Sequence, residues 1–241
     1  MLHCKGAGLT GAPAPPIFAA ARDGGMTAAG WPPKSVLESS MPLSAPAERE
    51  PIHTRTVTCQ GYRRSDGLWD VEGHLTDVKA YEFHTEQRGR IVPGDPVHGM
   101  WLRLTVDNDL TVHAVEAVTE KSPYRTCGAV TPNFQRLVGL KIGPGWTRAV
   151  KERLGGTQGC THLVELLGPI ATTAFQTIYP LLSREKAAKA RAEGKEDALR
   201  AKRPVLLNTC HIFDSSGEIV RKEWPDHYTG DRTAEEEQAA D

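Results

Sequence analysis

The sequence lacks the paired cysteines, the basic excess and the long apolar runs that mark several common protein classes. Its five cysteines are scattered over 241 residues, and no CxxC pair occurs, which excludes a zinc ribbon and a thioredoxin motif. The balance of 29 Lys plus Arg against 30 Asp plus Glu argues against a dedicated nucleic-acid-binding protein. No apolar run approaches the roughly 20 residues that cross a bilayer, so we expect no transmembrane helix.

What is present is the composition of a folded protein. Hydrophobic residues make up 39% of the chain and charged residues 24%, which is enough to build a packed core. An odd number of scattered cysteines predicts free thiols in a reducing, cytoplasmic compartment. We expect neither a membrane nor a nucleic acid as a partner, and assembly into a homo-oligomer stays open.

The chain divides by composition into an extension, a domain and a tail. Residues 1–50 are rich in Ala, Gly, Pro and Ser without a periodic apolar pattern, so they are expected to be flexible. Translation could also begin at Met26 or Met41. Residues 51–228 are expected to form a single domain, and residues 229–241 an acidic tail.

Alternating β-forming residues predict strands in the first half of the domain, and helical patterns follow. The predicted strands form an antiparallel meander over residues 53–62, 68–81, 97–106 and 110–118. The predicted helices are residues 131–140, 146–154 and 161–182, the last broken or kinked at Gly168-Pro169, with a solvated helix or helical linker over 183–203. A last hairpin is predicted from residues 205–213 and 218–223.

These elements predict an α+β fold, in which the antiparallel β-meander packs against two to four helices and a C-terminal hairpin completes the domain. The helix at residues 161–182 should cover one face of the sheet. The residues expected to be buried between them are Val71, Leu75, Leu102, Leu104, Leu163, Leu167 and Phe175.

The second predicted strand carries a line of polar residues. Period-two alternation separates them from the apolar residues and places Asp70, Glu72 and His74 on one face. If the polar faces of the next strands coincide with it, that face also carries Trp101, Arg103 and His113. Such a face could bind a substrate, because a guanidinium pairs with oxyanions. The alternative is a solvent-facing strand with an Arg103–Glu72 cross-strand pair that contributes little.

The helix predicted at residues 161–182 gives a second candidate site. His162 and Glu165 share one face, and Gln176 and Tyr179 continue this polar line if the kink is small. Polar residues on a largely buried helix must be hydrogen-bonded or line a cavity. The line is therefore either a structural network or an active site in which Glu165 orients the base His162.

Two other chemistries could use the same region. The pair His162-x-x-Glu165 has helical metal-ligand spacing, and further ligands could come from His74, His98 or His113. No HExxH motif is present, and no metal is predicted. Cys160, at the start of the helix, is an alternative nucleophile, because a helix N-terminus stabilises a thiolate.

Three segments together resemble a known bacterial family. They are residues 61–77 (GYRRSDGLWDVEGHLTD), 100–106 (MWLRLTV) and 159–167 (GCTHLVELL). They are similar to domain-of-unknown-function family 2889, and the resemblance extends over residues 51–228. It implies a role in bacterial catabolism of aromatic compounds, including the cofactor-independent loss of formaldehyde from lignin-derived dimers of the phenylcoumaran type. It brings no catalytic residues with it.

That reaction is a retro-aldol step, which needs a base, a stabiliser for a phenolate and an apolar slot. We expect His162 with Glu165 to act as the base and Arg103 or Tyr179 to contact the phenolate. Trp69 or Trp101 is expected to line the slot. If there is a site, one pocket should then be lined by Glu72, His74, Arg103, His162 and Glu165. The expected function is a formaldehyde lyase with a small aromatic substrate and no cofactor. A non-catalytic aromatic-binding domain and a metal-dependent hydrolase are the alternatives.

Overall fold

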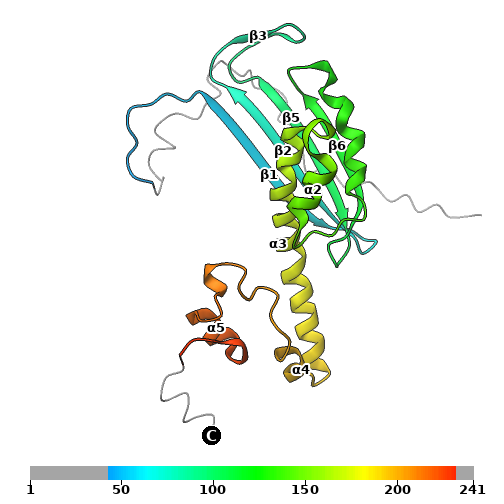
Figure 1. The fold of residues 1–241 in the computed structure, drawn as a ribbon, viewed down its shortest axis with the longest axis vertical. Helices are drawn as coiled ribbons and strands as arrows, with labels where there is room; N and C mark the ends of the chain where they lie inside the picture. Colours follow the sequence, from blue (N-terminus) through cyan, green and yellow to red (C-terminus); the bar gives the residue numbers. More distant parts are fainter. Residues whose placement is uncertain (1–42, 232–241) are drawn as a thin grey trace, which may run out of the picture. The chain divides into compact units, whose positions relative to one another are not determined.

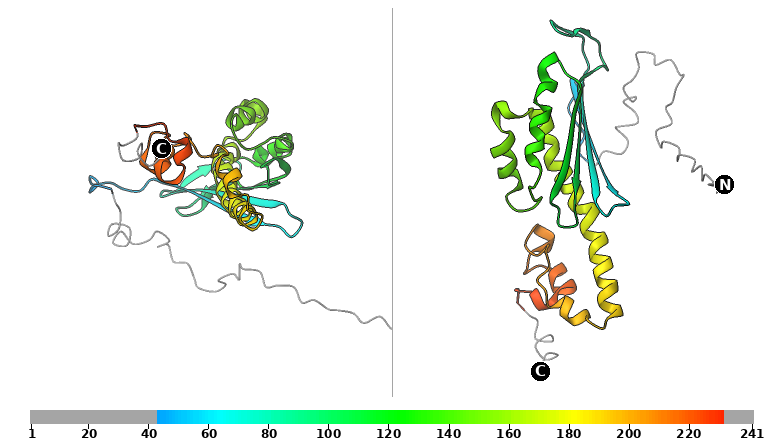
Figure 2. Two further views of the ribbon diagram at one scale, coloured as in Figure 1. Left: turned by 90° about the horizontal axis from the view of Figure 1, so that it is seen from below. Right: turned by 90° about the vertical axis from the view of Figure 1, so that its right-hand side faces the viewer.

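The computed structural model describes residues 43–231, so most of the predicted extension and tail lies outside it. A boundary after Pro51 separates a compact unit that begins at Ile52. In this unit an antiparallel sheet carries helices on one face, as the right-hand view of Figure 2 shows. No helix in the described part of the chain is long and apolar enough to span a membrane.

The sheet confirms the predicted meander. Its four strands are β1 (His53–Arg63), β2 (Trp69–Lys79), β5 (Pro96–Val106) and β6 (Val112–Lys121), and they lie in the order β1-β2-β5-β6 (Figure 1). Every neighbouring pair is antiparallel. Between β2 and β5 the chain forms a separate small hairpin from β3 (Phe83–Thr85) and β4 (Gly89–Ile91). Strands of three residues are too short to show alternation, so the sequence does not predict this hairpin.

The helices follow the sheet in the chain. They are the 3₁₀ helix η1 (Arg125–Leu137), α2 (Trp146–Leu154), η2 (Gly156–Gln158), α3 (Thr161–Ala192), α4 (Glu196–Arg200), η3 (His211–Phe213), α5 (Glu218–Glu223) and η4 (Pro225–His227). The α+β class is therefore confirmed, and α2 has the predicted bounds. Of the predicted break or kink at Gly168-Pro169, the break is wrong, because α3 continues through Pro169 and Pro180. The kink stays a prediction. Pro169 is exposed, so water can satisfy the carbonyl that it leaves unpaired.

The predicted C-terminal hairpin is also wrong. The first segment forms turns that end in η3, and the second forms α5. The ring centroids of Phe213 and Trp224 are 5.3 Å apart. The apolar alternation in these segments is short, and short runs do not distinguish a strand from a turn of helix. The fold thus ends in short helical turns around an aromatic pair.

The core lies between α3 and the sheet. Six of the seven residues expected there are at most 1% exposed: Val71, Leu75, Leu102, Leu104, Leu163 and Leu167. Phe175 is only half-buried, because it lines a cavity on the side of α3. Burying this many branched side chains supplies the main free energy that holds the helix on the sheet.

Two strand glycines let α3 approach the sheet closely. A Cβ atom at Gly73 would lie 2.7 Å from Cδ1 of Ile170, and one at Gly61 would lie 2.1 Å from the hydroxyl oxygen of Thr177. Real Cβ atoms do not come so near other heavy atoms, so a larger residue at either position pushes the helix outwards. The glycines therefore fix how deeply α3 sits, including its N-terminal turn.

We expect Gly73→Val to lower the free energy of unfolding by about 1 to 3 kcal/mol, because the added side chain collides with Ile170. Gly168→Ala is the matched control, since nothing lies within 4 Å of a Cβ at that helical position. It should raise the stability by roughly 0.5 to 1 kcal/mol through helix propensity. Urea titrations of the two variants measure both effects, and a Gly73→Val variant as stable as the wild type would contradict this packing.

Candidate functional site

The register of three strands places three ionisable residues in one row. Asp77 of β2 lies directly opposite Arg55 of β1 on one side and His98 of β5 on the other. By alternation Asp77 shares the helix-covered face with Val71 and Leu75. It is only 1% exposed, and it is the one charged residue that is buried in the described part of the chain.

Asp77 is held by hydrogen bonds on both carboxylate oxygens. Arg55 donates two hydrogen bonds to the Asp77 carboxylate, from Nε to Oδ1 at 2.8 Å and from Nη2 to Oδ2 at 2.9 Å. The His53 ring lies against Oδ1, with Nε2 at 3.0 Å, and the His98 ring lies against Oδ2, with Nδ1 at 3.0 Å. A bidentate guanidinium fixes both the position and the orientation of a carboxylate. The buried charge is thereby compensated.

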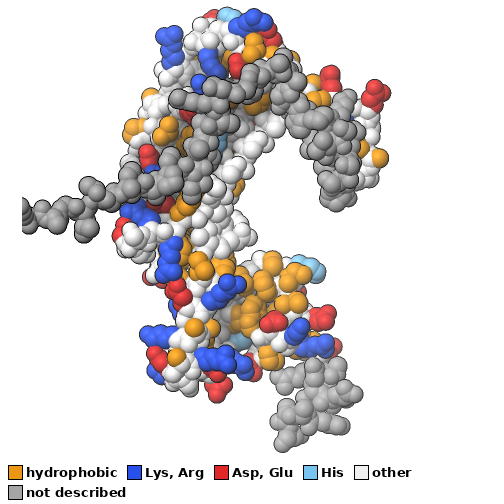
Figure 3. Space-filling view, turned by 180° about the vertical axis from the view of Figure 1, so that it is seen from behind, with side chains coloured by type: hydrophobic (Ala, Val, Ile, Leu, Met, Phe, Trp, Pro, Cys, Tyr) orange, Lys and Arg blue, Asp and Glu red, His pale blue; other side chains and the backbone are white. Residues whose placement is uncertain are grey.

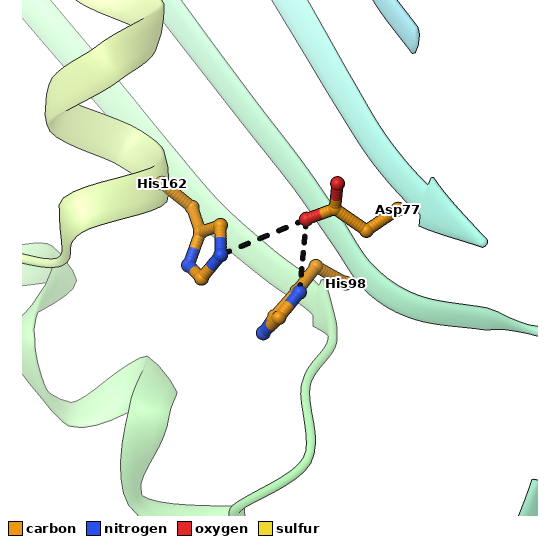
Figure 4. A group of neighbouring side chains, drawn as sticks. All are labelled: Asp77, His98 and His162. Atoms are coloured by element: carbon orange, nitrogen blue, oxygen red, sulfur yellow. Dashed lines mark hydrogen bonds and ion pairs between the residues drawn. The ribbon is translucent and has the colours of Figure 1, made fainter. Parts of the chain in front are cut away.

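The first turn of α3 adds two more side chains. His162 points at the same carboxylate oxygen as His98, with Nε2 3.6 Å from Oδ2 of Asp77 (Figure 4). The two imidazole rings lie 3.8 Å apart between centroids. Glu165, one turn further along α3, accepts a hydrogen bond from Nη1 of Arg55. We call Arg55, Asp77, His98 and His162 the Asp77 cluster.

The surroundings set the charge state of Asp77. Burial pushes the pKa of the carboxyl upwards, but the hydrogen bonds and the charge of Arg55 outweigh it, with help from His53 and His98. The result is a pKa lowered to about 2. Asp77 is therefore a carboxylate at neutral pH.

The two imidazoles of the cluster are shifted towards their neutral form. Burial lowers the pKa of His98, and the positive charges of a protonated His162 and of Arg55 lower it further, against the attraction of Asp77. Burial likewise lowers the pKa of His162, with Arg55 acting in the same direction and Asp77 and Glu165 opposing it. At neutral pH the site thus holds two neutral imidazoles beside a fixed carboxylate, the form in which imidazole accepts a proton or binds a metal.

Cys160 lies at the edge of this cluster. It is the N-cap residue of α3, and its Sγ atom is 3.8 Å from Nδ1 of His162. The thiol is partly buried. The nucleophile hypothesis for Cys160 stays a prediction.

The polar strand residues expected to share one face do so, but on the face opposite the Asp77 cluster. Arg103 donates hydrogen bonds to Glu72 and to Glu116, both at 2.7 Å. The bond to Glu72 is the cross-strand pair that the sequence offers as the alternative to a substrate-binding face. His74 stacks on Trp101 with ring centroids 3.7 Å apart. Charged side chains of both signs are scattered over this side in the view from behind (Figure 3).

A small cavity of about 250 Å³ opens on that face. It is lined by Glu72, Trp101, Leu102, Arg103, Glu116 and Val118. Asp70 accepts a hydrogen bond from Thr105 at 2.7 Å nearby. His113 does not line this cavity. Its Nε2 lies 2.8 Å from Oδ2 of Asp107, in the turn between β5 and β6.

The expected single pocket is therefore not what the structure shows. Glu72 and Arg103 lie directly opposite each other on β2 and β5, on the exposed face of the sheet. Successive residues of a strand point to opposite faces, so the sheet separates this pair from His162, which lies on the helix-covered face. Gln176 and Tyr179 line a different cavity, further along α3. Tyr179 is 17 residues from His162, which is ~25 Å along a helix axis.

The expected pairing of His162 with Glu165 also needs correction. Glu165 lies beside Arg55, and the carboxylate next to His162 is that of Asp77. The spacing i, i+3 places two residues on one helix face, but it does not make their side chains meet when a stronger partner is available. The guanidinium of Arg55 is that partner.

The cluster could also hold a metal ion. Asp77, His98 and His162 each offer one ligand atom, and these atoms lie within 4.8 Å of one another. Two neutral imidazoles and a carboxylate are a common ligand set for divalent transition metals. Arg55 opposes this use, because its positive charge lies against the carboxylate that a cation would need.

A protein-family model described as "Protein of unknown function (DUF2889)" matches residues 53–176, just over half of the chain. The chain belongs to the DUF2889 family. The matched stretch begins at the first residue of β1 and ends within α3, so it contains the whole Asp77 cluster. No curated protein and no solved structure matches the chain. The family resemblance is thereby confirmed, and the link to aromatic catabolism stays a prediction.

Sequence reasoning overlooked Asp77 and Arg55, although a signal for Asp77 exists. The alternation that makes Val71, Gly73 and Leu75 an apolar face reaches Asp77 two residues later. A carboxylate on an apolar face must find charged or hydrogen-bonding partners. The identity of those partners depends on strand register, which the sequence leaves open.

We expect Asp77→Asn to lower the free energy of unfolding at pH 7 by about 1.5 to 3 kcal/mol, the contribution of a charged hydrogen bond. The pKa of Asp77 is depressed to about 2, so its stabilisation is complete above pH 4 and is lost as the pH falls from about 4 to about 2. Denaturant titrations at several pH values should therefore show the two proteins converging in acid. A difference that does not shrink below pH 4 would contradict the assigned charge.

Proposed function

We propose that the protein is an acid–base lyase that releases formaldehyde from a lignin-derived aromatic dimer of the phenylcoumaran type, without a cofactor. One observation carries the acid–base part: a neutral His98 ring hydrogen-bonded to a buried, ionised Asp77, with His162 beside it. The substrate class rests on what the family resemblance implies. The four cysteines of the described chain are free thiols, which favours a reducing location such as the cytoplasm.

His98 is the better placed base. Asp77 is a carboxylate and can only accept, so Nδ1 of His98 carries the proton that joins them at 3.0 Å. This tautomer leaves the lone pair of Nε2 free. The ring is 17% exposed and the neighbouring His162 ring 24%, so a ligand can reach both from solvent.

The reaction then proceeds by a proton transfer to the base and two coupled bond cleavages. The primary hydroxyl of the substrate gives its proton to Nε2 of His98, and the C–C bond to the hydroxymethyl carbon breaks. That carbon leaves as formaldehyde, and the bonding electrons form a C=C double bond to the adjacent carbon. The ether C–O bond on that carbon breaks, and its oxygen leaves as a phenolate that takes up a proton. The imidazolium that forms lies against the Asp77 carboxylate, which stabilises its charge.

The other members of the cluster position this base. Arg55 holds Asp77 in place and keeps it ionised, and Glu165 accepts a bond from the remaining guanidinium nitrogen. His162 is a second acceptor at the same site, with its ring tilted by 31° against that of His98. Two imidazoles so close together do not both carry a charge at neutral pH. Arg103 and Tyr179 have no part in this step, because they lie elsewhere.

A divalent-metal hydrolase is the second candidate, favoured by the mutual distance of the ligand atoms of Asp77, His98 and His162. A metal there would polarise a substrate carbonyl or activate a water. It would have to displace the guanidinium of Arg55 from the carboxylate. The acid–base account needs no such rearrangement, and a chelator arm in the activity assay distinguishes the two.

We expect His98→Gln to reduce kcat for formaldehyde release roughly 100-fold or more, because glutamine keeps the hydrogen bond to Asp77 but cannot take up a proton at neutral pH. The assay incubates the pure protein with a panel of phenylcoumaran-type dimers and measures formaldehyde, with and without a chelator. In the wild type, kcat/KM should rise with pH through an apparent pKa below the ordinary value of about 6.5.

The matched control is His84→Gln, since His84 is exposed on β3, outside the cluster. It should keep wild-type activity and melting temperature. Activity that is abolished by the chelator and restored by a divalent metal would favour the hydrolase-type centre. Full activity in well-folded His98→Gln and His162→Gln would remove the basis of the proposal, and saturable binding without turnover would favour an aromatic-binding domain.

A further inference from the structure

A second and larger cavity lies along the side of α3, away from the Asp77 cluster. Its volume is about 720 Å³, within the range of small-molecule sites. The residues of α3 that line it include Thr172, Phe175, Gln176 and Tyr179. Other segments contribute Trp146 and Phe213, among others. We call this cavity the α3 groove. Gln176 lies fourteen residues after His162, which is ~21 Å along the helix, so the groove is separate from the proposed base.

The lining of the α3 groove disfavours a charged ligand. None of its lining residues is an Asp, Glu, Lys, Arg or His. An ionised ligand would therefore lose hydration on entry without gaining a counter-charge, which is costly. An uncharged ligand meets no such cost.

Flat apolar surfaces dominate the walls. The rings of Phe175 and Tyr179 are nearly parallel, with an interplanar angle of 10° and centroids 4.9 Å apart. Trp146 contributes its indole ring, while its N–H donates to the carbonyl of Leu167 at 3.3 Å. Aromatic rings prefer stacked or edge-on contacts with other rings, so a planar aromatic ligand extends the existing stack.

Two polar groups on the α3 wall of the groove are free for a ligand. The Thr172 hydroxyl already donates to the carbonyl of Gly168 at 3.3 Å. Within the described part of the chain, the Gln176 amide and the Tyr179 hydroxyl make no hydrogen bond with another residue. They lie three residues apart on α3, hence on one face. Together they match a ligand with a hydroxyl or ether oxygen at the edge of an aromatic body.

We propose that the α3 groove binds an uncharged phenolic or aryl-ether molecule at a site distinct from the Asp77 cluster. The inference goes beyond the lyase reaction and does not depend on it. It rests on the volume, the absence of charge in the lining, the stacked rings and the two free polar groups.

Binding of two probes of the same shape tests the proposal on the full chain. 2-Naphthol is uncharged at pH 7, whereas 2-naphthoate carries a carboxylate. Calorimetric titration should show one 2-naphthol bound per chain and at least tenfold weaker binding of 2-naphthoate. His98→Gln should leave the affinity for 2-naphthol unchanged, which separates the groove from the proposed active site whether or not the lyase reaction exists.

Gln176→Glu should weaken 2-naphthol binding at least tenfold, because it places a charge in the groove. Gln176 is exposed, so the variant should keep the wild-type melting temperature. Gln60→Glu is the matched control, an exposed glutamine on β1, and should bind as the wild type does. Equal affinity for both probes, or unchanged affinity in Gln176→Glu, would overturn the proposal. So would self-association that depends on Gln176, since the groove would then be covered by a second copy of the chain.

Discussion

The bidentate contact between Arg55 and Asp77 is the interaction on which the rest of the site depends. A carboxylate that is 1% exposed is tolerated only if its charge is met, and the guanidinium meets it with two hydrogen bonds. The same contact holds the pKa of Asp77 at about 2 and so supplies a permanent negative charge for the two imidazoles. Without it, burial would favour a protonated Asp77 that could not orient His98 as a base.

Strand register and helix depth bring the members of this cluster together. Arg55, Asp77 and His98 are neighbours across β1, β2 and β5, and a slip of one residue would turn each side chain to the opposite face. Gly61 and Gly73 let α3 lie close to the sheet, which brings His162 to the end of that row. The site is thus assembled by backbone pairing rather than by a sequence motif.

The fold could be predicted from the sequence where a pattern is long. Eleven-residue strands and the helix from Trp146 to Leu154 agree with their predicted positions within a few residues, because several periods of alternation or of helical spacing support them. The C-terminal hairpin was wrong, since its runs are too short to decide between a strand and a turn of helix. Of the site, His162 was identified, but its partner was not. Glu165 is close in sequence, whereas Asp77 is 85 residues away and meets His162 only through the packing of α3 on β2.

The measurement that tests this account most directly is the tautomer and titration of His98, followed by ¹⁵N NMR of histidine-labelled protein, with the signal assigned by its loss in His98→Gln. We expect a proton on Nδ1, an unprotonated Nε2 at pH 7, and a pKa of His98 below the ordinary histidine value. A ring with the proton on Nε2, or one that is still fully protonated at pH 7, would contradict it.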